Sequence, residues 1–228
     1  MVRRHPETPV GPGAEPSIPP LTTRPRPPML RLRGVTKRFG KRTVLDGFDL
    51  DVAAGELVAV VGANGSGKST LLKICAGVIR PDAGTVEVFG TVGWCPQAGG
   101  LADGLTADEQ FVLFGAPGNP TRATARARGR REAAAIDWTP TDQVASELSG
   151  GTRQKLNLVV STLGHPDLLL LDEPYQGFDR GTYLDFWTQV ERWRSQGRAV
   201  VVITHVLHEL HRVDRVVDLG RSERGVAV

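Results

Sequence analysis

Residues 62 to 69 read Gly62-Ala63-Asn64-Gly65-Ser66-Gly67-Lys68-Ser69, which fits the phosphate-binding pattern G-x-x-x-x-G-K-[ST]. The apolar run Leu57–Val61 precedes this loop, and a helical pattern over Lys68–Val78 opens at its end. This strand–loop–helix order is the context in which the pattern binds phosphate. The alternative is a glycine-rich turn that only connects a strand to a helix, and the Lys-Ser ending argues against it.

Each residue type in the loop has a chemical reason to be there. Glycines let backbone N–H groups turn toward phosphate oxygens without Cβ clashes, and the helix N-terminus adds partial positive charge. Lys68 supplies a full charge to the β- and γ-phosphates, and Ser69 offers its hydroxyl to Mg²⁺. The expected nucleotide-binding residues of this segment are Gly62, Asn64, Gly65, Ser66, Gly67, Lys68, Ser69 and Thr70.

The pattern outside the loop alternates between strands and helices. Apolar runs at Leu168–Leu171 and Val200–Ile203 resemble Leu57–Val61 and are typical of strands buried on both faces. Helical patterns at Thr152–Leu163 and Tyr183–Ser195 separate them. This order predicts an α/β fold, a phosphate-loop NTPase core with a mainly parallel central sheet.

The N-terminal side of the domain is expected to be an antiparallel β region. Leu30, Leu32 and Val35 indicate a first strand that ends near Phe39, and a second strand should cover Thr43–Val52, with a bulge or bend at Asp46-Gly47. The segment of about 98–147 is Ala- and Arg-rich and is broken by glycines and prolines between residues 115 and 120. We expect a small α-helical insertion there.

Composition sets the limits of the domain and its compartment. Residues 1–28 hold nine of the 16 prolines and no sustained apolar pattern, so they are expected to form a disordered arm before a domain at 29–228. No run approaches 18 apolar residues and the N-terminus has no apolar signal core, which predicts a cytoplasmic protein. The net charge of +3 is too small to require an anionic partner, and no nucleic acid is expected.

Two carboxylates follow the run Leu168–Leu171. Successive side chains of a strand point to opposite sides, so Asp172 can hold the shell of Mg²⁺ while Glu173 addresses a water molecule as general base. An acid pair at a solvated strand end is the alternative interpretation. The phosphate-binding loop in the same chain favours the catalytic one.

Together with these motifs, Leu148-Ser149-Gly150-Gly151 makes residues 29 to about 220 resemble the nucleotide-binding domain of ATP-binding-cassette (ABC) transporters. The stretch is similar to the signature loop of that family, and the motifs occur in the family's order. Gln97 matches the Q-loop glutamine, Gln176-Gly177-Phe178-Asp179 resembles the D-loop, and His205 matches the switch histidine. Phe39 stands where the family has an aromatic ring that stacks on adenine; an ordinary edge aromatic is the alternative.

The resemblance implies a role for each of these residues. ATP and Mg²⁺ are the implied cofactors, with Glu173, His205 and Gln97 as catalytic residues and Ser69, Gln97 and Asp172 at the metal. Two cassettes, as a homodimer, would pair head to tail, so that Ser149, Gly150 and Gly151 of one chain close on ATP held by the other. A separate transmembrane permease would hold the protein at the inner face of the cell membrane.

The resemblance favours a transporter motor, and the segments Leu71–Gly77 and Gly84–Gly90 look more like those of bacterial exporters, so export is the expected direction. A non-transport ABC ATPase acting in DNA repair or translation is the alternative, but the segment from Gln97 to Ser149 is too short for a coiled coil and the chain has one cassette. We expect the surface over Ala98–Val112, with Leu101, Leu105 and Phe111, to receive a cytoplasmic helix of the permease.

Two further clusters have alternative interpretations. The histidines at 205, 208 and 211, with Glu209, form a candidate metal cluster, or a switch histidine followed by surface histidines. The arginines at 122, 126, 128, 130 and 131 suit nucleic acid or phospholipid headgroups, or simply a solvated helix. The solvated-helix interpretation is preferred.

Overall fold

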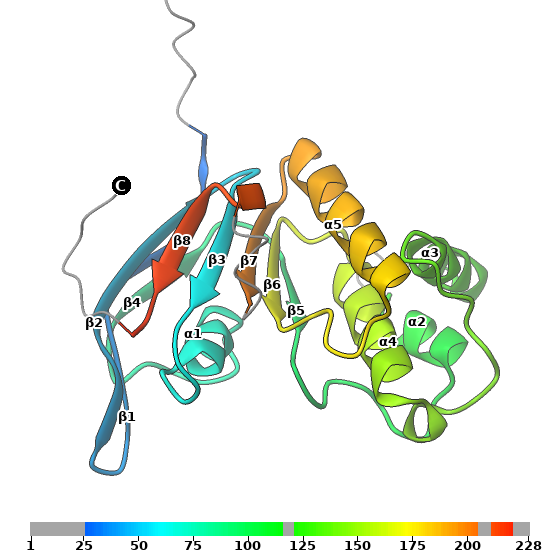
Figure 1. Ribbon diagram of the computed structural model, residues 1–228, viewed down its shortest axis with the longest axis horizontal. Coiled ribbons are helices and arrows are strands. Elements are labelled where there is room, and N and C mark those ends of the chain that lie inside the picture. Colours follow the sequence, from blue (N-terminus) through cyan, green and yellow to red (C-terminus); the bar gives the residue numbers. More distant parts are fainter. Residues whose placement is uncertain (1–25, 116–120, 205–210, 221–228) are drawn as a thin grey trace, which may run out of the picture.

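The structure is a computed structural model, and it describes residues 26–115, 121–204 and 211–220. Two sheets and a group of helices make three layers (Figure 1). The arm expected at residues 1–28 lies almost wholly outside the described residues. Within the described ranges, no helix has the length and apolar character needed to cross a membrane.

A five-stranded parallel sheet forms the centre of the molecule, which confirms the predicted fold class. Its strands are, in spatial order, β5 (Val92–Cys95), β6 (Leu168–Asp172), β7 (Ala199–Ile203), β3 (Leu57–Val61) and β8 (Arg215–Asp218). The three predicted apolar runs are the three inner strands. The two edge strands were not predicted, because each is covered incompletely and lacks a continuous apolar run.

Alternate residues of the inner strands enter two separate cores. Leu57 and Ala59 of β3 face one core with Leu169 and Leu171 of β6. Their neighbours Val58, Val60, Leu168 and Leu170 face the other core. All of these side chains are buried, so the period of two along each strand explains why the runs are apolar without a break.

A three-stranded antiparallel sheet, β2-β1-β4, covers the second core. Its strands are β1 (Pro28–Phe39), β2 (Arg42–Ala53) and β4 (Ala83–Val88). The pairing of β1 with β2 shifts register between Val35 and Lys37, opposite Gly47, whose φ is +63°. The antiparallel region and the bulge are therefore confirmed, and glycine suits the bulge because an L side chain disfavours this φ.

Helix α1 (Lys68–Cys75) lies between the two sheets (Figure 1). It is shorter than the predicted Lys68–Val78, because Ala76 caps the helix and Gly77 takes a φ of +71°. Cys75 on this helix and Cys95 on β5 are free and buried. Burial raises the pKa of both thiols, so they behave as apolar side chains.

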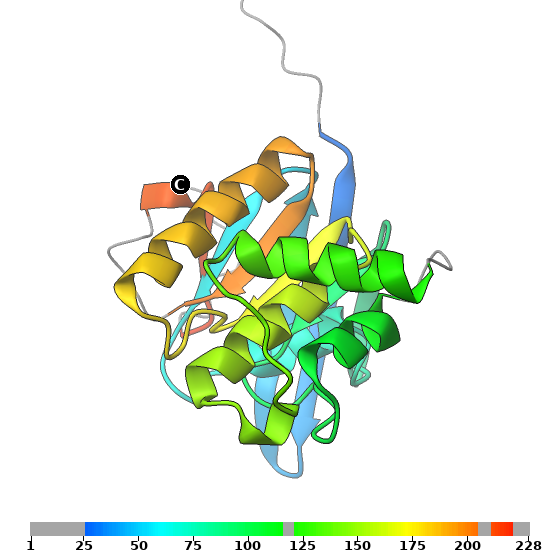
Figure 2. The same cartoon turned by 90° about the vertical axis from the view of Figure 1, so that its right-hand side faces the viewer.

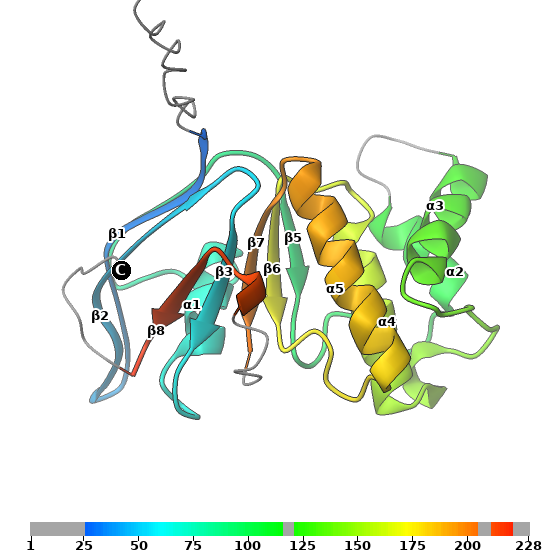
Figure 3. The same ribbon diagram turned by 45° about the horizontal axis from the view of Figure 1, so that its top comes forward.

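The other described helices lie on the opposite side of the parallel sheet, and Figures 2 and 3 show them on the side away from the antiparallel strands. They are α2 (Ala107–Phe114), α3 (Arg122–Ala134), α4 (Gly150–Thr162) and α5 (Arg180–Ser195), with a 3₁₀ turn at Ala145–Glu147. Helices α4 and α5 contact the sheet, and α2 and α3 pack against α4. Thr106 and Glu109 form a capping box at the start of α2. Helices α2 and α3 fall within the segment where a helical insertion was predicted.

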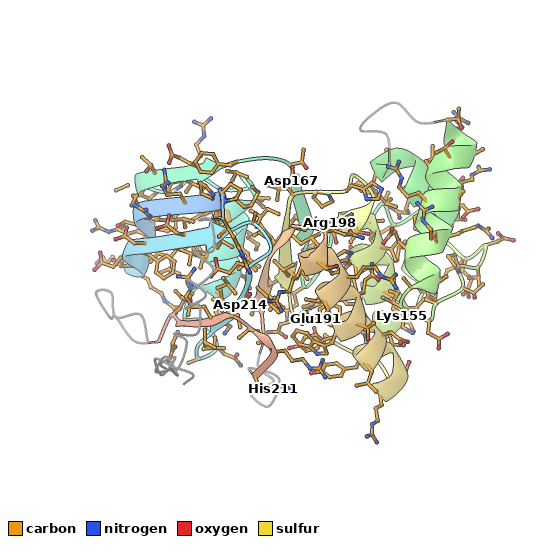
Figure 4. The ribbon with its side chains drawn as sticks, turned by 90° about the horizontal axis from the view of Figure 1, so that it is seen from above. Lys155, Asp167, Glu191, Arg198, His211 and Asp214 are labelled. Atoms are coloured by element: carbon orange, nitrogen blue, oxygen red, sulfur yellow. The ribbon has the colours of Figure 1, made fainter. Side chains whose placement is uncertain are left out.

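Helix α5 is tied to strand β8 (Arg215–Asp218) by a charged link. Arg194 of α5 donates to both carboxylate oxygens of Asp214 at 2.6 Å and also pairs with Glu191; Asp214 and Glu191 are labelled in Figure 4. Asp214 in turn accepts from the backbone N–H of Leu57 at the start of β3. This link places β8 beside β3 although their sequences are far apart.

Phe111 was expected on a docking surface, and this expectation is wrong. Its ring is fully buried and lies against Gly129 of α3. A Cβ atom at position 129 would overlap the Phe111 ring. Phe111 therefore holds α2 against α3 and is not available to a partner.

We expect Gly129→Ala to destabilise the protein by about 1–3 kcal/mol, the usual cost of overpacking a core. In an open helix the same change would stabilise by about 0.5–1 kcal/mol, so the sign tests the contact. Gly164→Ala is the control, because nothing lies within 4 Å of the added methyl group. Urea unfolding of both variants measures the difference, and a stabilised Gly129→Ala would contradict the close packing of α2 on α3.

Candidate nucleotide-binding site

One large open depression, of about 740 Å³, lies at the C-terminal edge of the parallel sheet. Its described lining comprises Phe39, Arg42, Val44, Asn64, Gly65, Gly67, Lys68, Ser69, Thr70, Gln97, Glu173 and Gln176. These residues come from the hairpin of β1 and β2, the loop before α1, the end of β5 and the end of β6. Parallel strands bring their carboxyl ends to one edge, which is why segments far apart in sequence meet there.

The loop before α1 is shaped by glycine. Gly67 has a φ of +103°, and a Cβ there would lie 2.6 Å from Cγ1 of Val44. Gly62 has a φ of +144°, and its Cβ would lie 2.8 Å from Oγ of Ser66. The loop therefore needs glycine both for its backbone angles and for its close approach to β2.

Lys68 is the charged group at the centre of this loop. Its side chain is buried, and Nζ donates to the carbonyl oxygens of Gly62 at 2.8 Å and Ala63 at 3.0 Å. An ammonium group has three N–H donors. The two carbonyls thus hold the charge at the floor of the depression, in reach of an anionic group bound by the loop.

Asp172 lies at the end of β6, directly behind the loop. The residue is 2% exposed, and burial raises the pKa of its carboxyl group while a hydrogen bond from Ser69 opposes that rise. Its Oδ1 is buried and has no hydrogen-bond partner among the described residues. A buried carboxylate oxygen without a partner, beside a serine hydroxyl, fits a hard cation such as Mg²⁺.

Glu173, the next residue, has a backbone conformation different from that of Asp172. Strand β6 ends at Asp172, and Glu173 takes a φ of +49°, in the left-handed region that non-glycine residues rarely adopt. A turn therefore gives the two carboxylates different surroundings. The expectation that both residues lie on the strand, with side chains on opposite sides, was wrong. Strained backbone of this kind is concentrated at functional sites.

Gln97 connects two sides of the depression. Its Nε2 donates to Oε2 of Glu173 at 3.2 Å and lies 3.4 Å from Oε1 of Gln176. Gln97 follows β5, whereas Glu173 and Gln176 follow β6. The predicted Q-loop glutamine and the predicted general base are thus in direct contact.

The predicted signature loop lies elsewhere. Ser149, Gly150 and Gly151 are not among the described residues that line the depression. Ser149 caps α4, and its Oγ accepts from the N–H of Thr152 at 3.3 Å. Ser149 and Gly150 are exposed, so the N-terminus of α4 faces outward from the chain.

The signature loop nevertheless contacts the turn after Glu173. A Cβ on Gly151 would overlap the carbonyl oxygen of Gly177, so only glycine allows this approach. Lys155 of α4, labelled in Figure 4, lies 3.6 Å from the carboxylate of Asp179. Asp179 caps α5 through Thr182, and these hydrogen bonds lower its pKa to about 2. The start of α4 is therefore held against the predicted D-loop of the same chain.

Sequence reasoning missed two residues of the depression, Arg42 and Val44, and it named Gln176 only as part of the D-loop. Phe39 pairs with Arg42 across a two-residue turn, so the hairpin brings Arg42 to the same rim as the 53%-exposed Phe39 ring. Arg42 donates to the carbonyl oxygen of Gly65 in the phosphate-binding loop. The signal in the sequence is the tight Gly40-Lys41 turn, which pairs Phe39 with Arg42.

His205, the predicted switch histidine, lies outside the described residues, as do His208 and Glu209 of the candidate metal cluster. Among the residues that are described, no group of three or more His, Cys, Asp or Glu side chains could hold a metal ion. The role of His205 stays a prediction.

Known proteins are similar to this chain in both sequence and fold. The family model described as ABC transporter matches residues 45–176. A Nod factor export ATP-binding protein I of Ralstonia nicotianae is 32% identical over 212 residues, covering 86% of this chain and 66% of that protein. The chain thus spans slightly less than two thirds of that relative. A zinc import ATP-binding protein of Chromohalobacter salexigens is 36% identical over 198 residues, covering 85% of this chain and 81% of that protein.

Among solved structures, a dimeric ATP-binding cassette in a post-hydrolysis state with ADP and Pi superposes with a TM-score of 0.79. It is 24% identical, and the match covers 86% of this chain and 97% of that one, so it shows the shared fold. The family match and the sequence relatives carry the assignment further. The chain belongs to the ABC transporter family and is a nucleotide-binding domain, an ATPase, of that family.

Proposed function

We propose that this chain hydrolyses ATP in a head-to-tail dimer and thereby drives a separate transmembrane subunit in the export direction. One observation carries the proposal. The phosphate-binding loop, Gln97 and Glu173 share one depression, whereas Ser149 and Gly150 are exposed at a different place on the chain. A second copy could supply the missing donors to each depression.

Some residues of the site are proposed to bind the nucleotide and Mg²⁺, and others to take part in hydrolysis. The loop amides and Lys68 would hold the phosphates, and Phe39 would stack on the adenine ring. Ser69, Asp172 and Gln97 would hold Mg²⁺, which supplies charge neutralisation at the phosphates when it is bound. Glu173 would take the proton of the attacking water, with Gln97 orienting its carboxylate through the 3.2 Å hydrogen bond. His205 is proposed as a further catalytic residue, on its match to the switch histidine.

The exposed N-terminus of α4 suits the γ-phosphate of ATP held by another copy. Ser149 Oγ, the Gly150 and Gly151 amides and the positive end of the helix dipole are all anion donors. ATP would then join two copies, and its hydrolysis would release them. Two contacts join the start of α4 to the segment after Glu173: Gly151 with Gly177, and Lys155 with Asp179. Closure of the dimer at α4 would therefore shift the turn that carries Glu173.

The partner and the direction of transport rest on similarity. Both named relatives are ATP-binding subunits, one of an export system and one of an import system. We propose export because the sequence pattern of residues 71–90 looks most like export subunits. A permease would then hold the chain at the cytoplasmic face of the membrane. The named relatives are transport proteins, so we do not propose a role in DNA repair or translation.

The base is tested by Glu173→Gln, which should keep ATP binding and lower the rate of hydrolysis at least ~100-fold, the scale of a lost general base. Glu191→Gln is the matched control, because Glu191 is exposed on α5 and should keep the wild-type rate. Phosphate release and ATP titration give the two quantities. Wild-type turnover in Glu173→Gln would show that another group is the base.

The split site is tested by Ser149→Arg, which should bind ATP in its own loop but fail to dimerise, since a bulky cation replaces the proposed γ-phosphate donor. The control is Ser146→Arg, another exposed serine three residues earlier. Sedimentation with a non-hydrolysable ATP analogue measures the dimer. Mixing Ser149→Arg with Lys68→Ala should restore one composite site, and a normal dimer of Ser149→Arg alone would rule out the split site.

The partner is tested on α2, the helix that follows Gln97 in the chain. Leu113 is 52% exposed there, and Leu184 of α5 is 49% exposed and serves as the control. Leu113→Glu should reduce co-purification with a membrane protein and leave the ATPase rate of the isolated chain unchanged; Leu184→Glu should change neither. Equal recovery of the same membrane protein with both variants would place the docking surface away from α2.

A further inference from the structure

Tyr175 stands two residues after Glu173 and contacts two separate parts of the fold. Its hydroxyl is hydrogen-bonded to Oγ1 of Thr204, at the end of β7. Its ring lies against α5, with centroids 5.1 Å from Tyr183, 5.5 Å from Phe186 and 6.2 Å from Trp187. Neither the sequence motifs nor the depression accounts for this residue.

The chain around Tyr175 is a compact pair of turns. The N–H of Gln176 donates to the carbonyl of Glu173 at 3.2 Å, and the N–H of Phe178 donates to the carbonyl of Tyr175 at 3.1 Å. The N–H of Glu173 donates to the carbonyl of Ile203 at 3.3 Å. The turn is thus joined to the end of β7 at two points, through the backbone at Glu173 and through the side chain at Tyr175.

This second point lies where it can fix the proposed base. Glu173 has left-handed backbone angles, which persist only when the surroundings hold them. The ring of Tyr175 packs against three aromatic rings of α5, and Thr204 is 2% exposed, so the partner of the hydroxyl is itself buried. Thr204 also directly precedes His205 in the sequence.

We propose that Tyr175 is a positioning residue for ATP hydrolysis, which holds Glu173 at a fixed place relative to the end of β7 through its hydrogen bond to Thr204. The inference rests on the proposed role of Glu173. Tyr175 does not line the depression, so it acts on turnover and not on nucleotide binding. Small displacements of a catalytic group are enough to lower a rate by about 10- to 100-fold.

The experiment removes only the hydroxyl. Tyr175→Phe keeps the ring on α5 and should lower kcat about 10-fold, while KM and the dissociation constant for ATP stay within about twofold of wild type. Thr204→Val should have the same effect, and Thr204→Ser, which keeps the hydroxyl, should retain most of the rate. The double variant Tyr175→Phe/Thr204→Val should be no slower than either single one, because both remove the same bond.

Thermal unfolding and ATP titration of every variant separate positioning from packing. A variant that loses rate while its melting temperature and ATP affinity are kept supports positioning. A wild-type kcat in Tyr175→Phe, rates that multiply in the double variant, or a rate loss that follows melting temperature alone would overturn it. If Glu173→Gln also keeps its rate, the proposed base fails; if only Tyr175→Phe does, the base stands and this inference falls.

Discussion

The burial of β3, β6 and β7 on both faces is the constraint on which the other parts of the molecule depend. Each inner strand sends alternate side chains into two cores, so neither face of the sheet can be left to solvent. The antiparallel sheet with α1 covers one face, and α4 and α5 cover the other, with α2 and α3 packed against α4 (Figures 1 and 2). Apolar burial, at about 25 cal/mol per Å², drives both layers onto the sheet.

This arrangement leaves the carboxyl edge of the sheet for polar groups. The strands stop there, and their following loops need hydrogen bonds that no strand partner supplies. Gly67 lets the loop before α1 fold close to Val44, Gly62 lets it fold close to Ser66, and two carbonyls of the loop hold the buried charge of Lys68. Asp172 and Ser69 lie directly behind it. The site thus forms where the ends of the parallel strands meet, and a few glycines give its loop the required shape.

The turn after β6 also connects the site with helices α4 and α5. Close approach of Gly151 to Gly177 fits the start of α4 against the turn after β6, and Lys155 adds a partly buried ion pair with Asp179. Tyr175 joins the same turn to α5 and to β7. One turn of six residues, 173–178, therefore contacts three elements, α4, α5 and the end of β7. Packed interiors transmit displacements because they deform in few ways.

The sequence by itself determined the inner strands, the loop before α1, the antiparallel region with its bulge, and the family, because these depend on local apolar period, glycine and motif order. It could not show the edge strands β5 and β8, which lack apolar runs, or that Phe111 is core, since its partner Gly129 is distant in sequence. Nor could it place Arg42 on the rim, or show that a turn and not strand alternation separates Asp172 from Glu173. These features arise from contacts between distant segments, and only the tertiary structure decides which segments meet.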